Sequence, residues 1–281
     1  MIAIDLGSNT IRACKMRLLD SGNFECEYSF ERIVGSARGL NHKGLADDAM
    51  SRIRAAISEL VSEAKFNSST AVATEAFRKA ANSDEFFARI YDDFGIKFKI
   101  ISGEYEAFLT RLGVSNRAKI LGLKIDNSVL IDLGGASTEI SFGNDSKSFD
   151  FGIITAIESD KSGAISQAKS FMDKFKFNSI ILTSGVPTTV ACLKYGLNYY
   201  NYNANLVNGT RLDKSDFINT INLLKTAFNK DELVGKNRAD LIVKGCEILL
   251  EFVGNSTCVA IDDGLREGLF IANQLNLKEK K

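Results

Sequence analysis

Two segments of this chain carry the same four residues, and their chemistry suits a phosphate group. Residues 4–7 read IDLG, and residues 131–134 repeat that order. In each segment an aspartate lies near the end of an apolar run that is typical of a buried strand. The glycine that follows allows a tight bend in which a ligand can approach the backbone. Successive backbone N–H groups in such a bend form a concave site for an anion.

The two bends also carry polar side chains that could bind a phosphate or its metal. Ser8, Thr10, Ser137 and Thr138 supply hydroxyl groups. Asp5 and Asp132 can hold a hydrated magnesium ion, which usually takes one or two carboxylates together with phosphate oxygens. The candidate phosphate-binding residues are Gly7, Ser8, Asn9 and Thr10 in the first bend and Gly134, Gly135, Ala136 and Ser137 in the second. Alternatively, each bend is an ordinary hairpin whose aspartate caps backbone amides, and the repetition argues against this.

The segments around the bends alternate between strand and helix patterns. After each bend a second strand is expected to return, near residues 10–18 and 138–142, and the pattern at 47–65 indicates an amphipathic helix. This alternation predicts an α/β fold. The hairpin that opens each half favours mixed rather than purely parallel sheets. Because the apolar pattern breaks around residues 114–126, we place one lobe over 1–115 and a second over 116–281.

Composition excludes several classes of protein. Lysine plus arginine and aspartate plus glutamate number 35 each, so no global basic field attracts nucleic acid or an anionic membrane. No apolar run approaches the ~20 residues of a membrane helix, and the first residues lack a basic leader. We therefore expect a cytoplasmic protein with five reduced cysteines. The one histidine, His42, excludes a histidine-rich zinc site and is interpreted as a solvated turn residue.

Six blocks, in order, resemble the exopolyphosphatase/guanosine pentaphosphate phosphatase family. The blocks are residues 4–10, 73–78, 101–107, 131–139, 237–240 and 263–268. That family belongs to the superfamily of actin, sugar kinases and heat-shock chaperone ATPases. The resemblance implies a two-lobed, actin-like (ribonuclease H-like) fold with mixed sheets and an interlobe cleft. It also implies that the helical C-terminal region of longer relatives is lacking, and it leaves open that the last helix packs back on the first lobe.

The resemblance implies roles for particular residues. Glu106 matches the general base that activates the attacking water, and Arg78 matches the arginine that binds substrate phosphate. Asp132 and Glu139 match metal-site carboxylates, which with Asp5 would hold Mg²⁺ or another divalent cation. From the residues alone, Glu106 could equally cap a helix start, Arg78 could be a surface arginine and Glu139 a solvated strand residue.

Two departures from the family pattern concern the turns. Ala136 stands where the family usually has a third glycine, and Val186 and Pro187 interrupt a turn that is usually rich in glycine. Because proline removes flexibility and an amide donor, these residues weaken the case for nucleotide recognition more than the case for phosphoryl chemistry. Arg238 and Arg266 also match family positions, where a structural salt bridge is an equal interpretation.

The expected function is magnesium-assisted attack of water on the terminal phosphate of inorganic polyphosphate or guanosine pentaphosphate. The sequence does not choose between these substrates or fix the oligomeric state, although the resemblance makes a homodimer an open expectation. Two alternatives remain: a non-catalytic module that binds polyphosphate or an alarmone, and an actin-like kinase or ATPase. The joint presence of Glu106, Asp132, Glu139 and Arg78 argues against the first, and Val186-Pro187 argues against the second.

Overall fold

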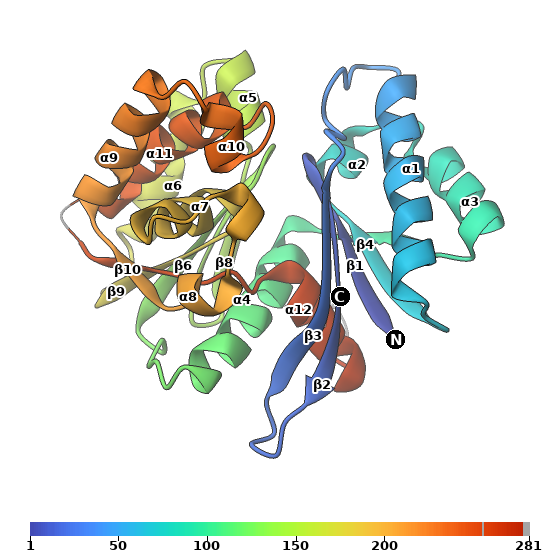
Figure 1. The fold of residues 1–281 in the computed structure, drawn as a ribbon, viewed down its shortest axis with the longest axis horizontal. Helices are drawn as coiled ribbons and strands as arrows, with labels where there is room; N and C mark the ends of the chain where they lie inside the picture. Colours follow the sequence, from blue (N-terminus) through green and yellow to red (C-terminus); the bar gives the residue numbers. More distant parts are fainter. Residues whose placement is uncertain (255, 278–281) are drawn as a thin grey trace. The chain divides into compact units, whose positions relative to one another are not determined.

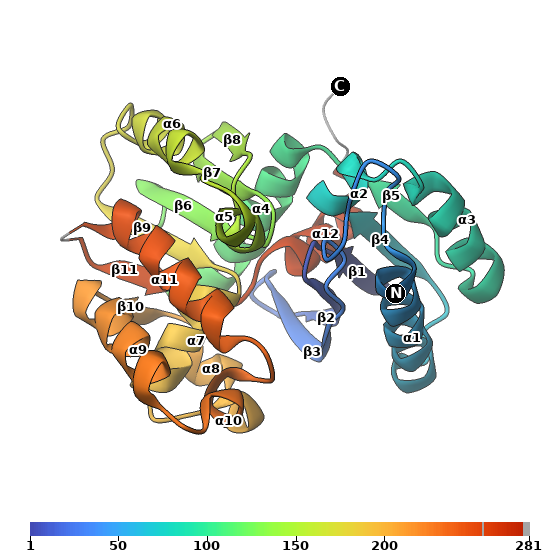
Figure 2. The same ribbon diagram turned by 90° about the horizontal axis from the view of Figure 1, so that it is seen from above.

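The chain divides into two compact units, each with its own sheet. The computed structural model describes residues 1–254 and 256–277. Unit 1 comprises Met1–Gly113 and the segment that begins at Leu265, and unit 2 comprises Val114–Gly264. Figures 1 and 2 show that the last helix, α12 (Leu265–Gln274), lies with the N-terminal elements although it comes from the end of the chain.

Unit 1 contains a five-stranded mixed sheet in the order β3-β2-β1-β4-β5. Its strands are β1 (Ile2–Leu6), β2 (Thr10–Leu18), β3 (Phe24–Ile33), β4 (Ser69–Ala73) and β5 (Phe98–Ile100). β1 pairs antiparallel with β2 and parallel with β4. Alternate residues of β1 reach two apolar cores, with Ile2, Ile4 and Leu6 in one and Ala3 in the other. Helices therefore cover both faces, which explains why β1 is an almost continuous apolar run.

The helices of unit 1 divide between those two cores. They are α1 (Asp47–Ala64), α2 (Glu75–Lys79), α3 (Ser83–Phe94), the first part of α4 (Gly103–Ile120) and α12. Ile53 and Ile57 of α1 share the core of Ile4, whereas Leu109 of α4 and Leu269 of α12 share the core of Ala3. The central strand thus has a helical layer on each side, and its carboxyl end is left for the first bend.

Unit 2 contains a six-stranded sheet in the order β10-β11-β9-β6-β7-β8. Its strands are β6 (Ser128–Leu133), β7 (Thr138–Phe142), β8 (Asp145–Phe149), β9 (Ser179–Thr183), β10 (Thr210–Leu212) and β11 (Cys258–Ala260). β6 pairs antiparallel with β7 and parallel with β9, as β1 does with β2 and β4. The repeat seen in the sequence is therefore a repeat of sheet topology. Among the described residues, unit 1 has no strand that corresponds to β10.

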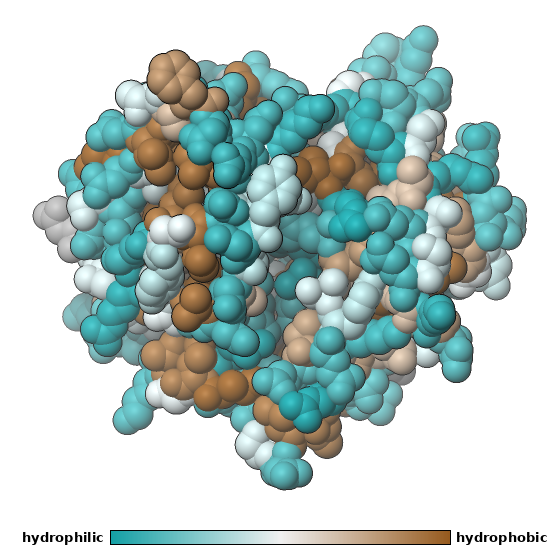
Figure 3. Space-filling view, viewed as in Figure 1, coloured by the Kyte–Doolittle hydropathy of each residue, from teal (hydrophilic) through white to brown (hydrophobic). Residues whose placement is uncertain are grey.

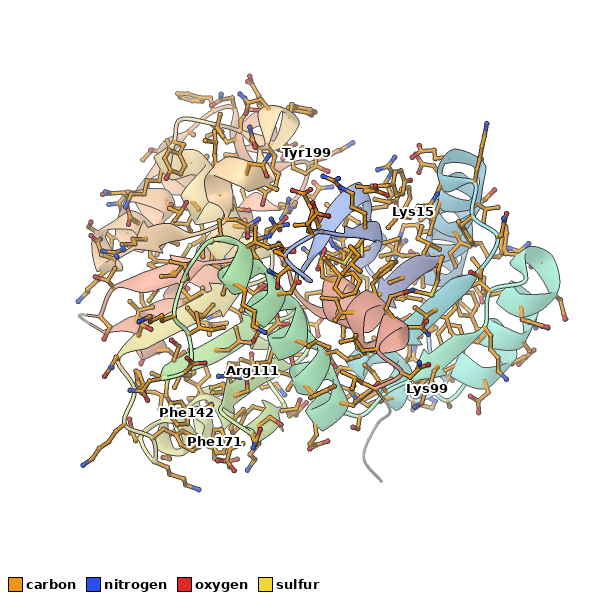
Figure 4. The ribbon with its side chains drawn as sticks, turned by 90° about the horizontal axis from the view of Figure 1, so that it is seen from below. Lys15, Lys99, Arg111, Phe142, Phe171 and Tyr199 are labelled. Atoms are coloured by element: carbon orange, nitrogen blue, oxygen red, sulfur yellow. The ribbon has the colours of Figure 1, made fainter. Side chains whose placement is uncertain are left out.

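The remaining helices belong to unit 2. They are α5 (Ile153–Glu158), α6 (Ser162–Met172), α7 (Gly185–Lys194), α8 (Ala204–Val207), α9 (Lys214–Thr226), α10 (Lys230–Val234) and α11 (Ala239–Val253), with a 3₁₀ turn at Tyr199–Asn201. Phe142 of β7 and Phe171 of α6, labelled in Figure 4, both pack against Phe175, at ring-centroid distances of 4.9 and 5.1 Å. Aromatic contacts of this kind hold α6 against the outer strands of the sheet.

Helix α4 is longer than the sequence pattern predicts. The apolar pattern breaks around residues 114–126, but α4 continues to Ile120. Its buried positions belong to different cores, with Leu109 in unit 1 and Val114 and Ala118 in unit 2. The apolar face therefore changes along the helix, and a single periodic pattern is lost.

Hydrophilic side chains dominate the surface drawn in Figure 3, and the cysteines are not paired in disulfides. The face drawn in Figure 3 is largely hydrophilic, with apolar patches over the helices of unit 2. All five cysteines are free thiols, and burial raises the pKa of Cys246 and of Cys258 to about 12. Over the described parts of the chain, no helix is both long enough and apolar enough to cross a membrane.

Candidate phosphate and metal site

The first bend is the turn of the β1–β2 hairpin. Asp5 lies opposite Arg12 in the register of this hairpin, and the Gly7 N–H donates to the Thr10 carbonyl at 2.9 Å, which closes the turn. Thr74, at the end of β4, donates its N–H to the Leu6 carbonyl. The turn therefore lies at the carboxyl ends of β1 and β4, the edge at which open α/β sheets bind ligands.

The segment that follows β3 braces this first turn. The N–H groups of Val34 and Gly35 both donate to the Asn9 carbonyl, at 2.9 and 2.8 Å, and Ala37 N–H donates to the Ser8 carbonyl at 2.8 Å. The carbonyls of the turn are thereby occupied by the neighbouring segment. This arrangement suits an anion site, in which backbone carbonyls would repel the ligand and N–H groups attract it.

The second bend is the turn of the β6–β7 hairpin and has the same closure. Asp132 lies opposite Glu139, and the Gly134 N–H donates to the Ser137 carbonyl at 3.0 Å. Ser184, which follows β9, donates its hydroxyl to the Leu133 carbonyl at 2.8 Å. This bend therefore lies at the carboxyl ends of β6 and β9, in the position that the first bend has in unit 1.

A glycine that the sequence analysis did not single out braces the second turn. Ile153 N–H donates to the Gly134 carbonyl at 3.0 Å, and Ile154 N–H donates to the Gly135 carbonyl at 2.7 Å. A Cβ added to Gly152 would lie 2.5 Å from the backbone of Gly135. Only glycine fits there without displacing the turn, because the neighbouring atoms belong to the main chain. Nothing local in the sequence marks this contact, which arises when the chain returns after β8.

Ala136 and Thr138 take structural places in the second turn. Positive φ angles among the described non-glycine residues occur at Lys65, Ser184, Asn237 and Asn276. Ala136 therefore has a backbone conformation that is open to any L-residue, and its methyl group does not strain the loop. The Thr138 hydroxyl, considered above as a phosphate donor, is buried and donates to the Phe151 carbonyl at 2.7 Å. That hydroxyl holds the brace in place instead of facing a ligand.

Asp132 and Glu139 form the carboxylate pair best suited to a divalent cation. Directly opposed residues of an antiparallel pair project from the same face, with Cβ atoms about 4.5–5.5 Å apart. Glu139 is 3% exposed and accepts a hydrogen bond from the Ser148 hydroxyl at 2.7 Å. No group of three or more histidine, cysteine, aspartate or glutamate side chains that could hold a metal occurs among the described residues. Two carboxylates fit magnesium, which keeps several waters and binds phosphate oxygens.

Asp5 has a different neighbour from Asp132. The residue opposite Asp5 is Arg12, whose Nε donates to Glu31 at 2.9 Å. A guanidinium beside a carboxylate competes electrostatically with a bound cation. Of the three predicted metal ligands, Asp5 is therefore the one that lies opposite a basic residue.

Arg78 and Glu106, the predicted phosphate arginine and general base, contact each other. Arg78 lies on the short helix α2, directly after β4, and its Nη1 lies 3.0 Å from Glu106 Oε2. Its Nε donates to Glu75 at 2.8 Å, and its Nη1 also donates to the Ile101 carbonyl at 2.7 Å. Burial disfavours the charged form of Arg78, but Glu106 and Glu75 outweigh that effect and raise the pKa of the guanidinium. Arg78 is therefore a fixed cation.

The structure separates Glu106 from its neighbour Glu104. Both lie in the first turn of α4, but Glu106 is 8% exposed whereas Glu104 is exposed to solvent. An acid that only favours the helix dipole has no need of burial or of a buried arginine. A phosphate that binds Arg78 would compete with Glu106 for the same guanidinium, which couples substrate binding to release of the carboxylate.

Val186 and Pro187 are easily accommodated at the start of α7. Pro187 occupies the first turn of the helix, where backbone N–H groups have no intrahelical partner, so its missing donor costs little. Val186 is buried, and its Cγ2 would lie 2.4 Å from a Cβ on Gly245 of α11. These residues therefore serve helix packing. Ser184, just before the helix, has φ 80° and ψ −175°, a region that is costly for any residue but glycine.

The two other candidate arginines have local partners. Arg266 forms an ion pair with the buried Glu267 of α12. The Arg238 guanidinium lies over the ring of Tyr199, at 5.6 Å from its centroid; Tyr199 is labelled in Figure 4. Both contacts favour a structural interpretation of these two residues.

Comparison with known proteins identifies the family. The profile of the Ppx/GppA phosphatase family matches residues 28–277. The chain belongs to this family. Among curated relatives, guanosine-5'-triphosphate,3'-diphosphate pyrophosphatases of Vibrio cholerae serotype O1 and Photobacterium profundum are 34% and 31% identical over 145 and 160 residues. These matches cover 50% and 56% of this chain but only 28% and 31% of the relatives, so the aligned part is under a third of their length.

Solved structures show the same fold. A Ppx/GppA family member from Aquifex aeolicus has a TM-score of 0.74 at 24% identity, with 99% of this chain and 98% of that one covered. An exopolyphosphatase from Cytophaga hutchinsonii has a TM-score of 0.77 at 19% identity, with the same coverage. The α/β fold with two mixed sheets that the sequence predicted is thereby confirmed.

Proposed function

We propose that this chain is a phosphoanhydride hydrolase that removes the terminal phosphate of inorganic polyphosphate or of guanosine pentaphosphate. The observation that carries this proposal is the repeated hairpin turn. In both units a glycine N–H closes the turn, and N–H groups of a later segment donate to its carbonyls. Such turns offer N–H groups to phosphate oxygens. Membership of the Ppx/GppA phosphatase family supports a phosphate chain as the substrate.

In this proposal unit 1 supplies the acid–base chemistry. Glu106 accepts a proton from the attacking water while the water oxygen bonds to the terminal phosphorus and the bridging P–O bond breaks. Arg78 binds oxygens of that phosphoryl group and stabilises the charge of the transition state. Their 3.0 Å contact supports the pairing, because a phosphate that draws Arg78 away leaves Glu106 free to accept the proton.

Unit 2 contributes the residues that would hold magnesium. Asp132 and Glu139 fit the ion as a facing pair, and Ser148 orients Glu139. Bound magnesium would neutralise charge on the phosphates. The N–H groups of Gly7 and Gly134 close their turns. The main-chain N–H groups of Gly135 and Ala136 in unit 2, and of residues 8–10 in unit 1, are proposed to bind phosphate oxygens.

The test is orthophosphate release from long-chain polyphosphate and from guanosine pentaphosphate, measured side by side with and without magnesium. The proposal expects magnesium-dependent release from at least one of the two substrates. Calorimetric binding without turnover would favour the non-catalytic module instead. Transfer of phosphate from a nucleotide to an acceptor, without release from polyphosphate, would favour the kinase.

The proposal also covers the location, partners and oligomeric state of the protein. We infer a cytoplasmic enzyme without nucleic-acid or membrane partners, in keeping with a net charge of zero. Light scattering of the purified chain tests whether it forms a homodimer.

A further inference from the structure

The connection between β3 and α1 has an unusual charge for this protein. Residues 34–46, here called the basic loop, contain Arg38, His42 and Lys43 but no aspartate or glutamate, although the whole chain has equal numbers of basic and acidic residues. In Figure 1 it is the blue segment that leads from β3 to the start of α1, and Figure 3 shows hydrophilic side chains there. The basic loop is therefore a local source of positive charge.

The basic loop is fixed at both ends beside the proposed phosphate-binding groups of unit 1. At its start, Val34, Gly35 and Ala37 bind the first turn through the hydrogen bonds described above, and Arg52 Nε donates to the Val34 carbonyl at 2.7 Å. At its end, the Asn82 side chain accepts from Leu45 N–H at 2.8 Å and donates to the Leu45 carbonyl at 3.1 Å. Since Asn82 follows the helix that carries Arg78, the loop is tied to both phosphate-binding elements.

Arg38 is exposed, folds over a glycine and has no carboxylate partner among the described residues. A Cβ on Gly35, which has φ 58°, would lie 2.8 Å from Arg38 Cδ, so the side chain folds over this glycine. The Arg38 guanidinium forms no ion pair or hydrogen bond with any described residue. By contrast, carboxylates pair with the arginines at positions 12, 17, 32, 52, 54, 78 and 89 of the same unit. An exposed cation without a counter-ion is suited to an anionic ligand.

Ser36 gives an independent indication of a ligand. This residue has no exposed surface, and its hydroxyl has no hydrogen-bond partner. A buried hydroxyl without a partner costs free energy, which a ligand oxygen could recover. Ser36 lies between Gly35 and Ala37, whose N–H groups bind the first turn, so its hydroxyl is next to this brace.

We propose that the basic loop binds phosphate groups of the substrate that are remote from the bond being cleaved. Arg38 is the principal cation, Lys43 extends the positive charge, and Ser36 contributes its hydroxyl. The ligand is a row of phosphate oxygens, which either a long polyphosphate chain or the 3'-diphosphate of guanosine pentaphosphate could supply. This inference rests on the proposed hydrolase function and adds to it a determinant of substrate length.

The test compares binding of long-chain polyphosphate, tripolyphosphate and guanosine pentaphosphate to the full chain by titration calorimetry over a range of salt concentrations. The variants are Arg38→Gln combined with Lys43→Gln, Arg38→Lys alone, and Lys97→Gln as the matched control. Lys97 is an exposed cation of the same unit at the start of β5, outside the basic loop. Circular dichroism confirms that each variant is folded.

For the double variant we expect affinity for long-chain polyphosphate to fall roughly tenfold, with a shallower salt dependence, because released counterions drive such binding. Affinity for tripolyphosphate should fall less, and Arg38→Lys and Lys97→Gln should stay near the wild-type affinity. In turnover assays the loss should lie in KM more than in kcat. A selective loss for guanosine pentaphosphate instead would identify the 3'-diphosphate as the ligand.

Ser36→Ala tests the proposal without a change of charge. Because the hydroxyl has no partner in the free protein, this variant should be at least as stable as the wild type and yet bind polyphosphate several-fold more weakly. Wild-type affinity and salt dependence in the double variant, or an equal loss in Lys97→Gln, would overturn the inference. Since binding is measured without turnover, an absence of hydrolysis would count against the proposed function alone.

Discussion

The β1–β2 hairpin of unit 1 and the β6–β7 hairpin of unit 2 share one backbone design and differ at one opposed pair. Both place an aspartate near the end of the first strand, and both close the turn through the N–H of the glycine two residues later. Opposite that aspartate lies Arg12 in unit 1 and Glu139 in unit 2. The backbone turn that we propose as an anion site is therefore present in both units, and one opposed side chain distinguishes a carboxylate beside a cation from a pair of carboxylates.

The segments that brace the two turns also differ. After β3 the brace leads into the basic loop, whereas after β8 it passes through Gly152 and enters α5. Unit 1 thus has basic residues near its turn, and unit 2 has the two carboxylates that we propose hold a metal. The two turns therefore share a backbone design and differ in the charge of the side chains around them.

The largest effect is expected from removing the base in unit 1. Glu106→Gln should lower kcat by about 10²–10⁴-fold, the usual contribution of general acid–base catalysis. Steady-state phosphate release measures it, with Glu104→Gln as the matched control because that acid is exposed in the same helical turn. Full activity in Glu106→Gln would remove the base from unit 1.

Replacing Glu139 and Arg12 one at a time tests whether the two hairpins differ in metal binding. Glu139→Gln should raise the magnesium concentration needed for half-maximal activity by about 10–100-fold, because one of two carboxylates is lost. Arg12→Gln, at the matching register position, should leave that requirement near the wild-type value. An equal shift in both variants, or a shift only in Arg12→Gln, would mean that metal binding does not distinguish the hairpins.

The brace of the second turn is tested by overpacking it. In Gly152→Ala the new methyl group meets main-chain atoms of the turn at 2.5 Å, so the variant should lose about 1–3 kcal/mol of unfolding free energy. Chemical denaturation measures the loss. Gly163→Ala in α6, where a Cβ would meet nothing within 4 Å, should instead be neutral or stabilising. Equal stability of the two variants would show that Gly152 does not support the turn.

The smallest effect concerns Ser184, which has a hydrogen bond and an unfavourable backbone conformation. Ser184→Ala should lose about 1 kcal/mol, because it keeps the positive φ and removes the bond to Leu133. Ser184→Gly should be the more stable of the two variants, since glycine tolerates this conformation. Thermal unfolding of both variants decides the matter, and an alanine variant as stable as the glycine variant would contradict the account.

The parts of the fold that repeat locally could be predicted from the sequence, whereas contacts made at long range could not. The two hairpins follow from apolar runs that end at aspartate and glycine, and the facing of Asp132 and Glu139 follows from hairpin pairing. The continuation of α4 was hidden because its buried face changes between cores. The contact at Gly152 and the positive φ of Ser184 depend on packing between distant segments and leave no local signal.

The candidate site shows the same division. The family blocks implied roles for Arg78 and Glu106, but their ion pair and the contact of Arg78 with Glu75 depend on the folding of separate segments. The charge of the basic loop, by contrast, is visible in the sequence, because the segment lacks acidic residues.

The most direct test follows the oxygen atom of the attacking water. Polyphosphate and guanosine pentaphosphate are incubated with the chain and magnesium in water labelled with heavy oxygen, and the released orthophosphate is analysed by mass spectrometry. Hydrolysis at the terminal phosphoryl group predicts that each released orthophosphate carries one labelled oxygen and that Glu106→Gln abolishes most of the signal. Unlabelled orthophosphate, or no release from either substrate, would contradict the account.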